Sequence, residues 1–102
     1  MRVARPAVYI LASKRNGTLY VGVTGDLASR TSIHKQDLSN GFTRRYGVHL
    51  LVHYEYFDSM LEAIAHEKIL KKLARTAKIS MIETNNPLWR DLTSEIELGA
   101  RS

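Results

Sequence analysis

The sequence predicts an α+β domain in which helices flank a small antiparallel sheet of three strands, in the order β-β-α-β-α-α. Two short apolar runs joined by a turn open the chain, and such a hairpin makes its two strands antiparallel. A third apolar strand is followed by longer segments with helical spacing, which is typical of the α+β class. The 102 residues are enough for one domain, at about 100–200 residues per domain. We expect that domain over residues 1–92, with a frayed tail over 93–102.

The first two strands are expected at residues 7–13 and 18–23, on either side of "KRNG". Asn16-Gly17 within this connection is a strong hairpin signal, because both residues tolerate the positive φ of tight turns.

Two hairpin registers are compatible with the sequence. A loop of four residues, 14–17, places Tyr9 opposite Gly22, whereas a two-residue loop places Leu11 there. In both registers Tyr9 and Tyr20 project from the same face, because side chains alternate with period two along a strand. In the first register Gly22 leaves space beside Tyr9 for another group to approach.

The remaining elements follow with short gaps. They are a helix over 27–38 capped by Thr24 or Asp26, a loop over 39–49, a strand over 50–57, a long helix from Asp58 or Ser59 to about Leu73, and a shorter helix from Thr76 to about Glu83. Pro87 ends helical structure, because proline lacks the N–H that continues a helix. We expect Leu88-Trp89 to dock on the core.

The charge of the chain is positive, with 15 Lys and Arg against 10 Asp and Glu. This favours a polyanionic partner, with nucleic acid first and an anionic membrane surface second. The absence of cysteine excludes disulfides and thiolate metal sites, and it is compatible with a reducing cytoplasm. No apolar run approaches the ~20 residues needed to span a bilayer, and the apolar patch near the N-terminus is too short for a signal peptide. We therefore expect a cytoplasmic protein without membrane association.

One carboxylate lies on the apolar side of the expected long helix. At about 100° per residue, Glu67 shares this side with Met60, Ala63, Ile64 and Leu70. A carboxylate that faces a core needs a cation or several hydrogen-bond donors to offset its desolvation. A metal ion would meet this need, and a salt bridge or a side chain that reaches to solvent would meet it as well.

Polar residues also interrupt two other elements. Arg30 and His34, four residues apart, share a helix face with Leu27 and Leu38, where the guanidinium is suited to a phosphate. The alternatives are an exposed ion pair for Arg30 and a half-buried histidine for His34. Asn86 either forms part of a turn before Pro87, where asparagine is common, or points its amide into a site.

Together, these residues resemble the GIY-YIG nuclease family. "AVY" (7–9) stands in the place of GIY, with Ala7 for its glycine, and "YVG" (20–22) stands for YIG. The resemblance covers about residues 5–92 and is strongest to small stand-alone bacterial members akin to the N-terminal nuclease domain of the excinuclease C subunit. The family's helix arginine falls on Arg30, the histidine of several branches on His34, its metal-binding glutamate on Glu67 and its late asparagine on Asn86.

The resemblance implies hydrolysis of DNA phosphodiester bonds with one divalent metal, Mg²⁺ or Mn²⁺, held by Glu67. Arg30 would stabilise charge on the phosphate, Tyr20 would donate a hydrogen bond, and Gly22 and Asn86 would shape the site. Tyr9 is the candidate general base, although a phenol titrates near pH 10 and its deprotonation at pH 7 costs about 4 kcal/mol. Arg30, His34 or a water on the metal would have to lower that pKa, or hydroxide would have to arrive in another way; the sequence leaves this open.

Basic side chains are expected to bind the DNA backbone without reading its sequence. They are Arg44, Arg45, Lys68, Lys71, Lys72 and Arg75. The first hypothesis is an endonuclease for branched, damaged or single-stranded DNA with a role in repair, and a protein partner would supply the specificity that no appended domain provides. The second is a nucleic-acid-binding module with weak or no catalysis. A purely structural domain is disfavoured by the charge and by the candidate site.

Overall fold

The computed structural model describes residues 5–30 and 47–96. The regular elements are β1 (Ala7–Ala12), β2 (Leu19–Thr24), β3 (Leu50–Tyr56), α3 (Met60–Lys72) and α4 (Arg75–Asn85). Residues 27–30 and 93–96 are also helical. The strands lie in the order β2-β1-β3, and β1 pairs with both neighbours antiparallel. The predicted α+β fold with a three-stranded antiparallel sheet is confirmed.

The β1–β2 hairpin has the register of the four-residue loop. Ser13 N–H donates to Thr18 O at 3.0 Å, and Asn16 has a positive φ of 60° within the turn. Tyr9 consequently faces Gly22, as the longer loop predicts.

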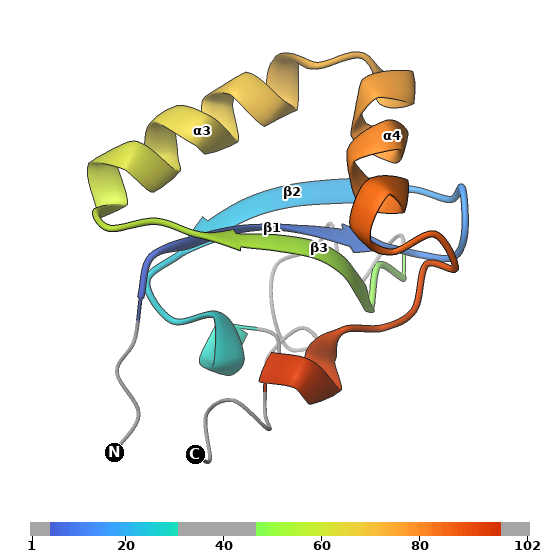
Figure 1. Ribbon diagram of the computed structural model, residues 1–102, viewed down its shortest axis with the longest axis horizontal. Helices are drawn as coiled ribbons and strands as arrows, with labels where there is room; N and C mark the ends of the chain where they lie inside the picture. The colour runs from blue at the N-terminus through green and yellow to red at the C-terminus, as the bar shows by residue number, and fades with distance from the viewer. Residues whose placement is uncertain (1–4, 31–46, 97–102) are drawn as a thin grey trace.

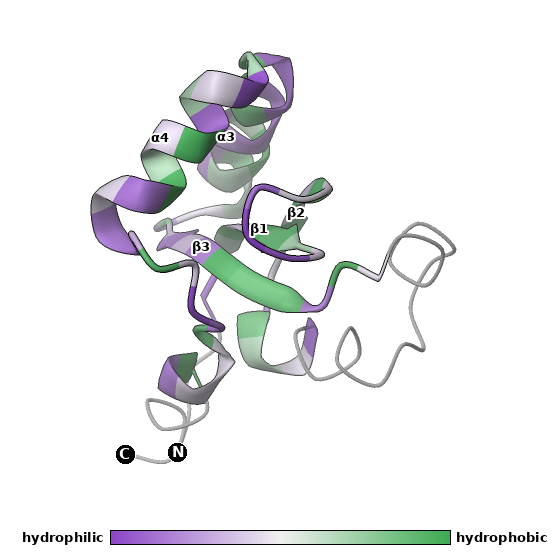
Figure 2. Cartoon of the chain, turned by 90° about the vertical axis from the view of Figure 1, so that its right-hand side faces the viewer, coloured by the Kyte–Doolittle hydropathy of each residue, from purple (hydrophilic) through white to green (hydrophobic). Residues whose placement is uncertain are grey.

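The sheet is covered on both faces (Figure 1). Helices α3 and α4 lie over one face, and the helical residues 27–30 and 93–96 lie under the other. The two apolar clusters take alternate residues of β1: Val8, Ile10 and Ala12 belong to the cluster that includes α3 and α4, and Ala7, Tyr9 and Leu11 belong to the opposite cluster. Figure 2 shows the two helices stacked on one side of a largely hydrophobic sheet. Because all of β1 is buried, this strand fixes the position of Tyr9.

The long helix starts where the sequence indicates. Ser59 is the N-cap, in extended conformation, and its hydroxyl accepts a hydrogen bond from Glu62 N–H at 3.2 Å. The next helix begins at Arg75, one residue before the predicted start, and continues two residues beyond the predicted end. It extends to Asn85 because only Asn86, the residue directly before proline, is sterically kept out of helical geometry.

The segment after α4 packs more tightly than predicted. Trp89 docks on the core and donates from Nε1 to Glu83 Oε2 at 2.7 Å, whereas Leu88 is exposed, so the docking prediction is correct for one residue and wrong for the other. The chain turns at this point, where Trp89 N–H donates to Asn86 O at 3.0 Å and Trp89 has a positive φ of 56°. The expected tail does not begin at Thr93, because residues 93–96 form a helical turn in which Thr93 and Ile96 are buried.

Three predicted site residues lie outside the described residues, namely His34, Arg44 and Arg45. The same holds for most of the helix expected over 27–38 and of the loop expected over 39–49. Within residues 5–30 and 47–96, none of the helices has both the length and the apolar character that a membrane crossing requires.

Candidate active site

The two tyrosines and the glycine of the hairpin form one packed unit. The ring centroids of Tyr9 and Tyr20 are 6.3 Å apart with an interplanar angle of 38°, and a side-chain hydrogen bond joins the phenols. A Cβ atom built on Gly22 would lie 2.5 Å from both Cζ and Oη of Tyr9, which is closer than such atoms approach. The space beside Tyr9 that the sequence predicts is therefore occupied by the Tyr9 phenol itself. Gly22 is required because this ring crosses β2.

Burial controls the acidity of Tyr9, which is 2% exposed. Desolvation is the largest cause that raises the pKa of its phenol far above the ordinary value, and Tyr20 raises it further. The charge of Arg30 lowers this pKa, but by less than burial raises it, and the charge of Glu67 raises it further. Both charged groups thus lie within electrostatic range of the Tyr9 hydroxyl, as a shared site requires.

Arg30 is positioned by a short helical turn that follows β2. Asp26 acts as its N-cap, because the carboxylate accepts hydrogen bonds from Ser29 N–H at 3.4 Å and from Ser29 Oγ at 3.1 Å. Leu27 is buried in the same cluster as Tyr9. This anchor places Arg30 on the Tyr9 side of the sheet, with its side chain exposed.

Glu67 arrives from α3, on the other face of the sheet. Its side chain is only 13% exposed and its Oε2 lies 2.8 Å from Lys71 Nζ, four residues along the helix. The carboxylate is therefore nearly buried and has a cationic partner. α3 packs over β1 and β2, the two strands that carry the tyrosine pair.

The predicted basic patch is divided by the structure. Lys71 lies beside Glu67, whereas Lys68 and Lys72 are exposed and, at about 100° per residue, point some 100° and 140° away from Glu67 around the helix. Arg75 lies beyond the end of α3 and donates from Nη2 to the carbonyl oxygens of Asn16 and Gly17 at 2.6 Å. Arg75 thus holds the hairpin loop against the helices.

Asn86 has its amide committed to the backbone. Its Nδ2 donates to Val52 O at 3.2 Å and to Arg90 O at 2.9 Å, and its Oδ1 accepts from Arg90 N–H at 2.9 Å. These bonds tie the turn after α4 to β3. Of the two alternatives that the sequence leaves open for Asn86, the structure shows the turn.

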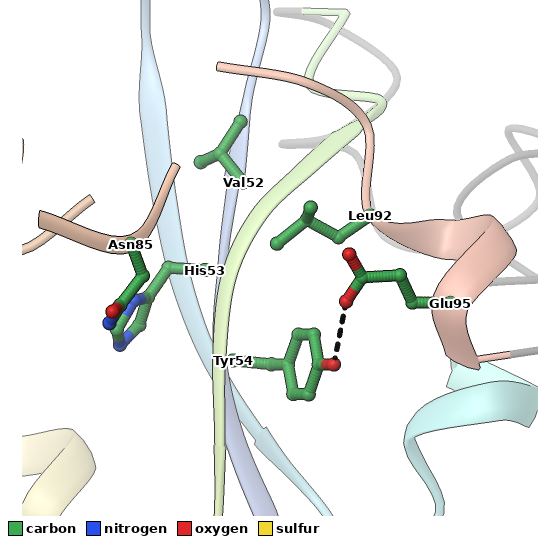
Figure 3. Close-up of a pocket in the computed structure, with 6 residues that line it drawn as sticks. All are labelled: Val52, His53, Tyr54, Asn85, Leu92 and Glu95. Atoms are coloured by element: carbon green, nitrogen blue, oxygen red, sulfur yellow. Dashed lines mark hydrogen bonds between the residues drawn. The ribbon is translucent and has the colours of Figure 1, made fainter. Parts of the chain in front are cut away.

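A pocket of about 250 Å³ lies along β3 (Figure 3). It is lined by Val52, His53, Tyr54, Asn85, Leu92 and Glu95. None of these is a predicted site residue. Tyr54 faces Tyr9 across β1 and β3 and donates from its hydroxyl to Glu95 Oε1 at 3.0 Å; burial and this bond raise the pKa of Tyr54 to about 12. Tyr54 is not among the residues singled out from the sequence; the period-two alternation of side chains along the third strand is the signal that could have placed it on this face.

Two histidines meet between β3 and α3. The Nε2 atoms of His53 and His66 are buried, and neither has a hydrogen-bond partner within the described part of the chain. His66 Nε2 lies 3.4 Å from Glu55 Oε1 without forming a hydrogen bond, and its ring lies 5.0 Å from that of Phe57. Desolvation is the main cause that lowers the pKa of His53.

Comparison with known proteins gives a consistent assignment. Residues 5–80 match the model of the GIY-YIG catalytic domain. The chain belongs to the GIY-YIG family. GIY-YIG domains are nuclease domains that act on DNA, so the family places this chain among the nucleases.

The relatives of this GIY-YIG chain are proteins of similar length. It is 34% identical over 91 residues to a UPF0213 protein of Clostridium perfringens, covering 89% of this chain and 97% of that protein. It is 33% identical over 81 residues to a UPF0213 protein of Staphylococcus haemolyticus, covering 79% and 98% of the two chains. The solution NMR structure of the UPF0213 protein from Bacillus halodurans is 29% identical, with a TM-score of 0.54, and the match covers 88% of this chain and 95% of that one.

Proposed function

We propose that the protein is a divalent-metal-dependent endonuclease that hydrolyses DNA phosphodiester bonds. Its proposed active site consists of Tyr9, Tyr20, Arg30 and Glu67. The observation that carries the proposal is the match of residues 5–80 to the GIY-YIG catalytic domain, supported by the packed Tyr9–Tyr20 pair beside Gly22. These four residues lie on β1, β2, the turn after β2 and α3, so the proposed site draws on segments that are far apart in sequence.

The donor set fits a hard divalent cation. Glu67 is the carboxylate that we propose as the protein ligand, since its side chain is only 13% exposed. Among the described residues, no three His, Cys, Asp or Glu side chains are grouped so that they could hold a metal. Mg²⁺ suits such a site because it often takes only one or two carboxylates and completes its shell with water and substrate phosphate. Such an ion, or Mn²⁺ in its place, would supply positive charge to the scissile phosphate. Lys71 has to yield its contact with Glu67 for the ion to bind.

The side chains of the protein then have distinct roles. The guanidinium of Arg30, exposed on the Tyr9 side, contacts a phosphate oxygen with its planar fork of donors. Burial raises the pKa of Tyr9, so in the free enzyme its phenol is protonated and donates its hydrogen bond to Tyr20. To act as the general base, Tyr9 would need a nearby cation to lower that pKa. Tyr20, bonded to Tyr9, holds the phenolic proton of Tyr9 in place or donates its own.

The finer features of the activity are also proposals. Branched or damaged DNA is the substrate we propose, with a role in repair, and a partner protein would provide the specificity. The cytoplasmic location and the phosphate contacts of Lys68, Lys71, Lys72, Arg44 and Arg45 stay predictions. The bonds of Arg75 to the hairpin loop support a structural role for that residue instead.

A cleavage assay tests the proposed function. Wild type and Glu67→Gln are incubated with nicked, branched and single-stranded DNA in Mg²⁺ or Mn²⁺, with EDTA as the metal-free control. We expect cleavage by the wild type to fall at least about 100-fold in the variant, since a lost transition-state contact of this kind is worth about 2.7–4 kcal/mol. Glu62→Gln, on the exposed first turn of α3, is the matched control and should cleave like the wild type. Equal DNA binding with no cleavage by any of the three would support the binding module instead.

A further inference from the structure

The side of α3 that faces away from the sheet carries a row of apolar side chains in solvent. The row consists of Leu61, Ala65 and Ile69, spaced four residues apart, and Leu61 and Ile69 are 81% and 58% exposed. Residues four apart on a helix stack on one face. By helical geometry, Ala65 lies about 160° around α3 from Glu67, so this row is opposite the candidate active site. It does not belong to the core or to that site.

The charges beside this row are separated along the helix. Asp58 and Glu62 lie at its N-terminal end, and Lys68 and Lys72 lie at its C-terminal end. All four are exposed, and no ion pair within residues 5–30 and 47–96 engages them. A partner of uniform negative charge would match the lysines but would be repelled by the two carboxylates. A second α3 in antiparallel orientation matches both ends.

The small side chain at the centre fits the same arrangement. Ala65 is the midpoint of the row, so a two-fold axis that passes by Ala65 brings Leu61 of one chain next to Ile69 of the other. The acidic end of each helix then lies by the basic end of its partner. The absence of a large side chain at Ala65 lets the two helices approach closely where they cross.

We propose that the outer side of α3 is a self-association surface on which a second copy of this chain docks with its α3 antiparallel. The 13 residues of α3 extend only about 20 Å, so the contact is smaller than the about 1,200 Å² of a stable interface and the dimer is weak and reversible. Because Glu67 lies on the opposite side of α3, both candidate active sites stay accessible. The inference does not depend on the proposed catalytic residues, but in the dimer Lys68 and Lys72 face the carboxylates of the partner in place of DNA phosphates.

Charge reversal on the full chain tests the arrangement. One variant carries Asp58→Lys and Glu62→Lys, and the other carries Lys68→Glu and Lys72→Glu. Each variant alone places like charges at both ends of the helix pair, so its association constant, measured by sedimentation equilibrium up to about 1 mM, should fall about tenfold or more, given the strength of exposed ion pairs. An equimolar mixture restores opposite charges at both ends and should return within about threefold of the wild type.

Further measurements test whether the variants are folded and whether something other than a second copy binds the outer side of α3. Ile69→Lys should abolish association, whereas Leu88→Lys, at an equally apolar exposed residue outside the row, should leave it unchanged. Thermal melts confirm that each variant is folded, since the mixture experiment requires both. A wild type that stays monomeric to 1 mM, or a mixture no better than its components, would overturn the proposal. Binding to anionic vesicles that only Lys68→Glu/Lys72→Glu removes would show a membrane occupant, and would also overturn it.

Discussion

Gly22 is the residue whose role the structure defines most sharply. A glycine inside a strand often marks a place where another group approaches the backbone. The sequence indicated such a place, but not that the approaching group is Tyr9 from the adjacent strand. The 2.5 Å distance from a built Cβ to the Tyr9 ring shows that any side chain at this position displaces the phenol.

The Gly22→Ala substitution is expected to destabilise the protein by about 1–3 kcal/mol, because overpacking a buried site costs that much. Urea unfolding measures the change. In a Tyr9→Leu background the closest obstruction is gone and Tyr20 Cε1, 3.0 Å from the built Cβ, remains. The same substitution should then cost clearly less stability than in the wild type. An equal loss of stability in both backgrounds would show that the ring does not cause the conflict.

The raised pKa of Tyr9 leads us to expect that the protein loses stability at alkaline pH. Its folded-state pKa is raised above the unfolded value of about 10, so folding holds the proton more tightly than the unfolded chain does. This contribution is fully present below pH 10 and is lost as pH rises further. The free energy of unfolding of the wild type should fall above pH 10 more steeply than that of Tyr9→Phe, by up to about 1.4 kcal/mol per pH unit. Parallel curves for the two proteins would contradict the assignment.

At the scale of elements, the contact between β3 and α3 is the least satisfied part of the described structure. It contains two buried imidazole nitrogens without hydrogen-bond partners, on His53 and His66, beside the carboxylate of Glu55. A buried polar atom without a partner costs stability. Because α3 also carries Glu67, the packing of this contact bears on the candidate active site.

His53 predicts a loss of stability in acid. Its folded-state pKa is lowered by burial, so below the unfolded value of about 6.5 the unfolded chain binds a proton that the folded protein resists. The contribution of His53 to the free energy of unfolding is thus fully present above pH 6.5 and declines as the pH falls below it. His53→Leu should reduce the decline between pH 6.5 and 5, by up to about 1.4 kcal/mol per pH unit, in urea unfolding series at each pH. An unchanged acid slope would exclude His53 as the cause.

At the scale of the whole molecule, local sequence signals predicted the architecture well. Asn16-Gly17 marked the hairpin, Ser59 capped α3, and apolar periodicity located the strands, since each of these rests on short-range geometry. Features that depend on tertiary contacts were not predictable in the same way. The bonds of Asn86 to β3 and of Arg75 to the hairpin loop join residues 34 or more positions apart, and no local pattern marks such pairs.

The candidate site divides along the same line. Family resemblance selected Tyr9, Tyr20, Arg30 and Glu67; Tyr20 packs against Tyr9, and the charges of Arg30 and Glu67 both act on the pKa of the Tyr9 phenol. Periodicity alone identified Glu67 as inward-facing. The lysines of α3 were predicted as one basic surface from their positions in sequence, whereas Lys71 contacts Glu67 and Lys68 and Lys72 point elsewhere. Residues four apart share a helix face, whereas residues adjacent in sequence point in different directions around the helix.

The central claim is that Glu67 holds a divalent ion beside the tyrosine pair, and paramagnetic Mn²⁺ tests it most directly. Substoichiometric Mn²⁺ is added to ¹⁵N-labelled wild type and Glu67→Gln, and line broadening of the backbone amide signals is mapped along the chain. We expect selective broadening at Tyr9, Gly22, Arg30 and Glu67 in the wild type and its loss in the variant. Broadening that centres on Glu55 or Glu95, or that is the same in both proteins, would contradict it.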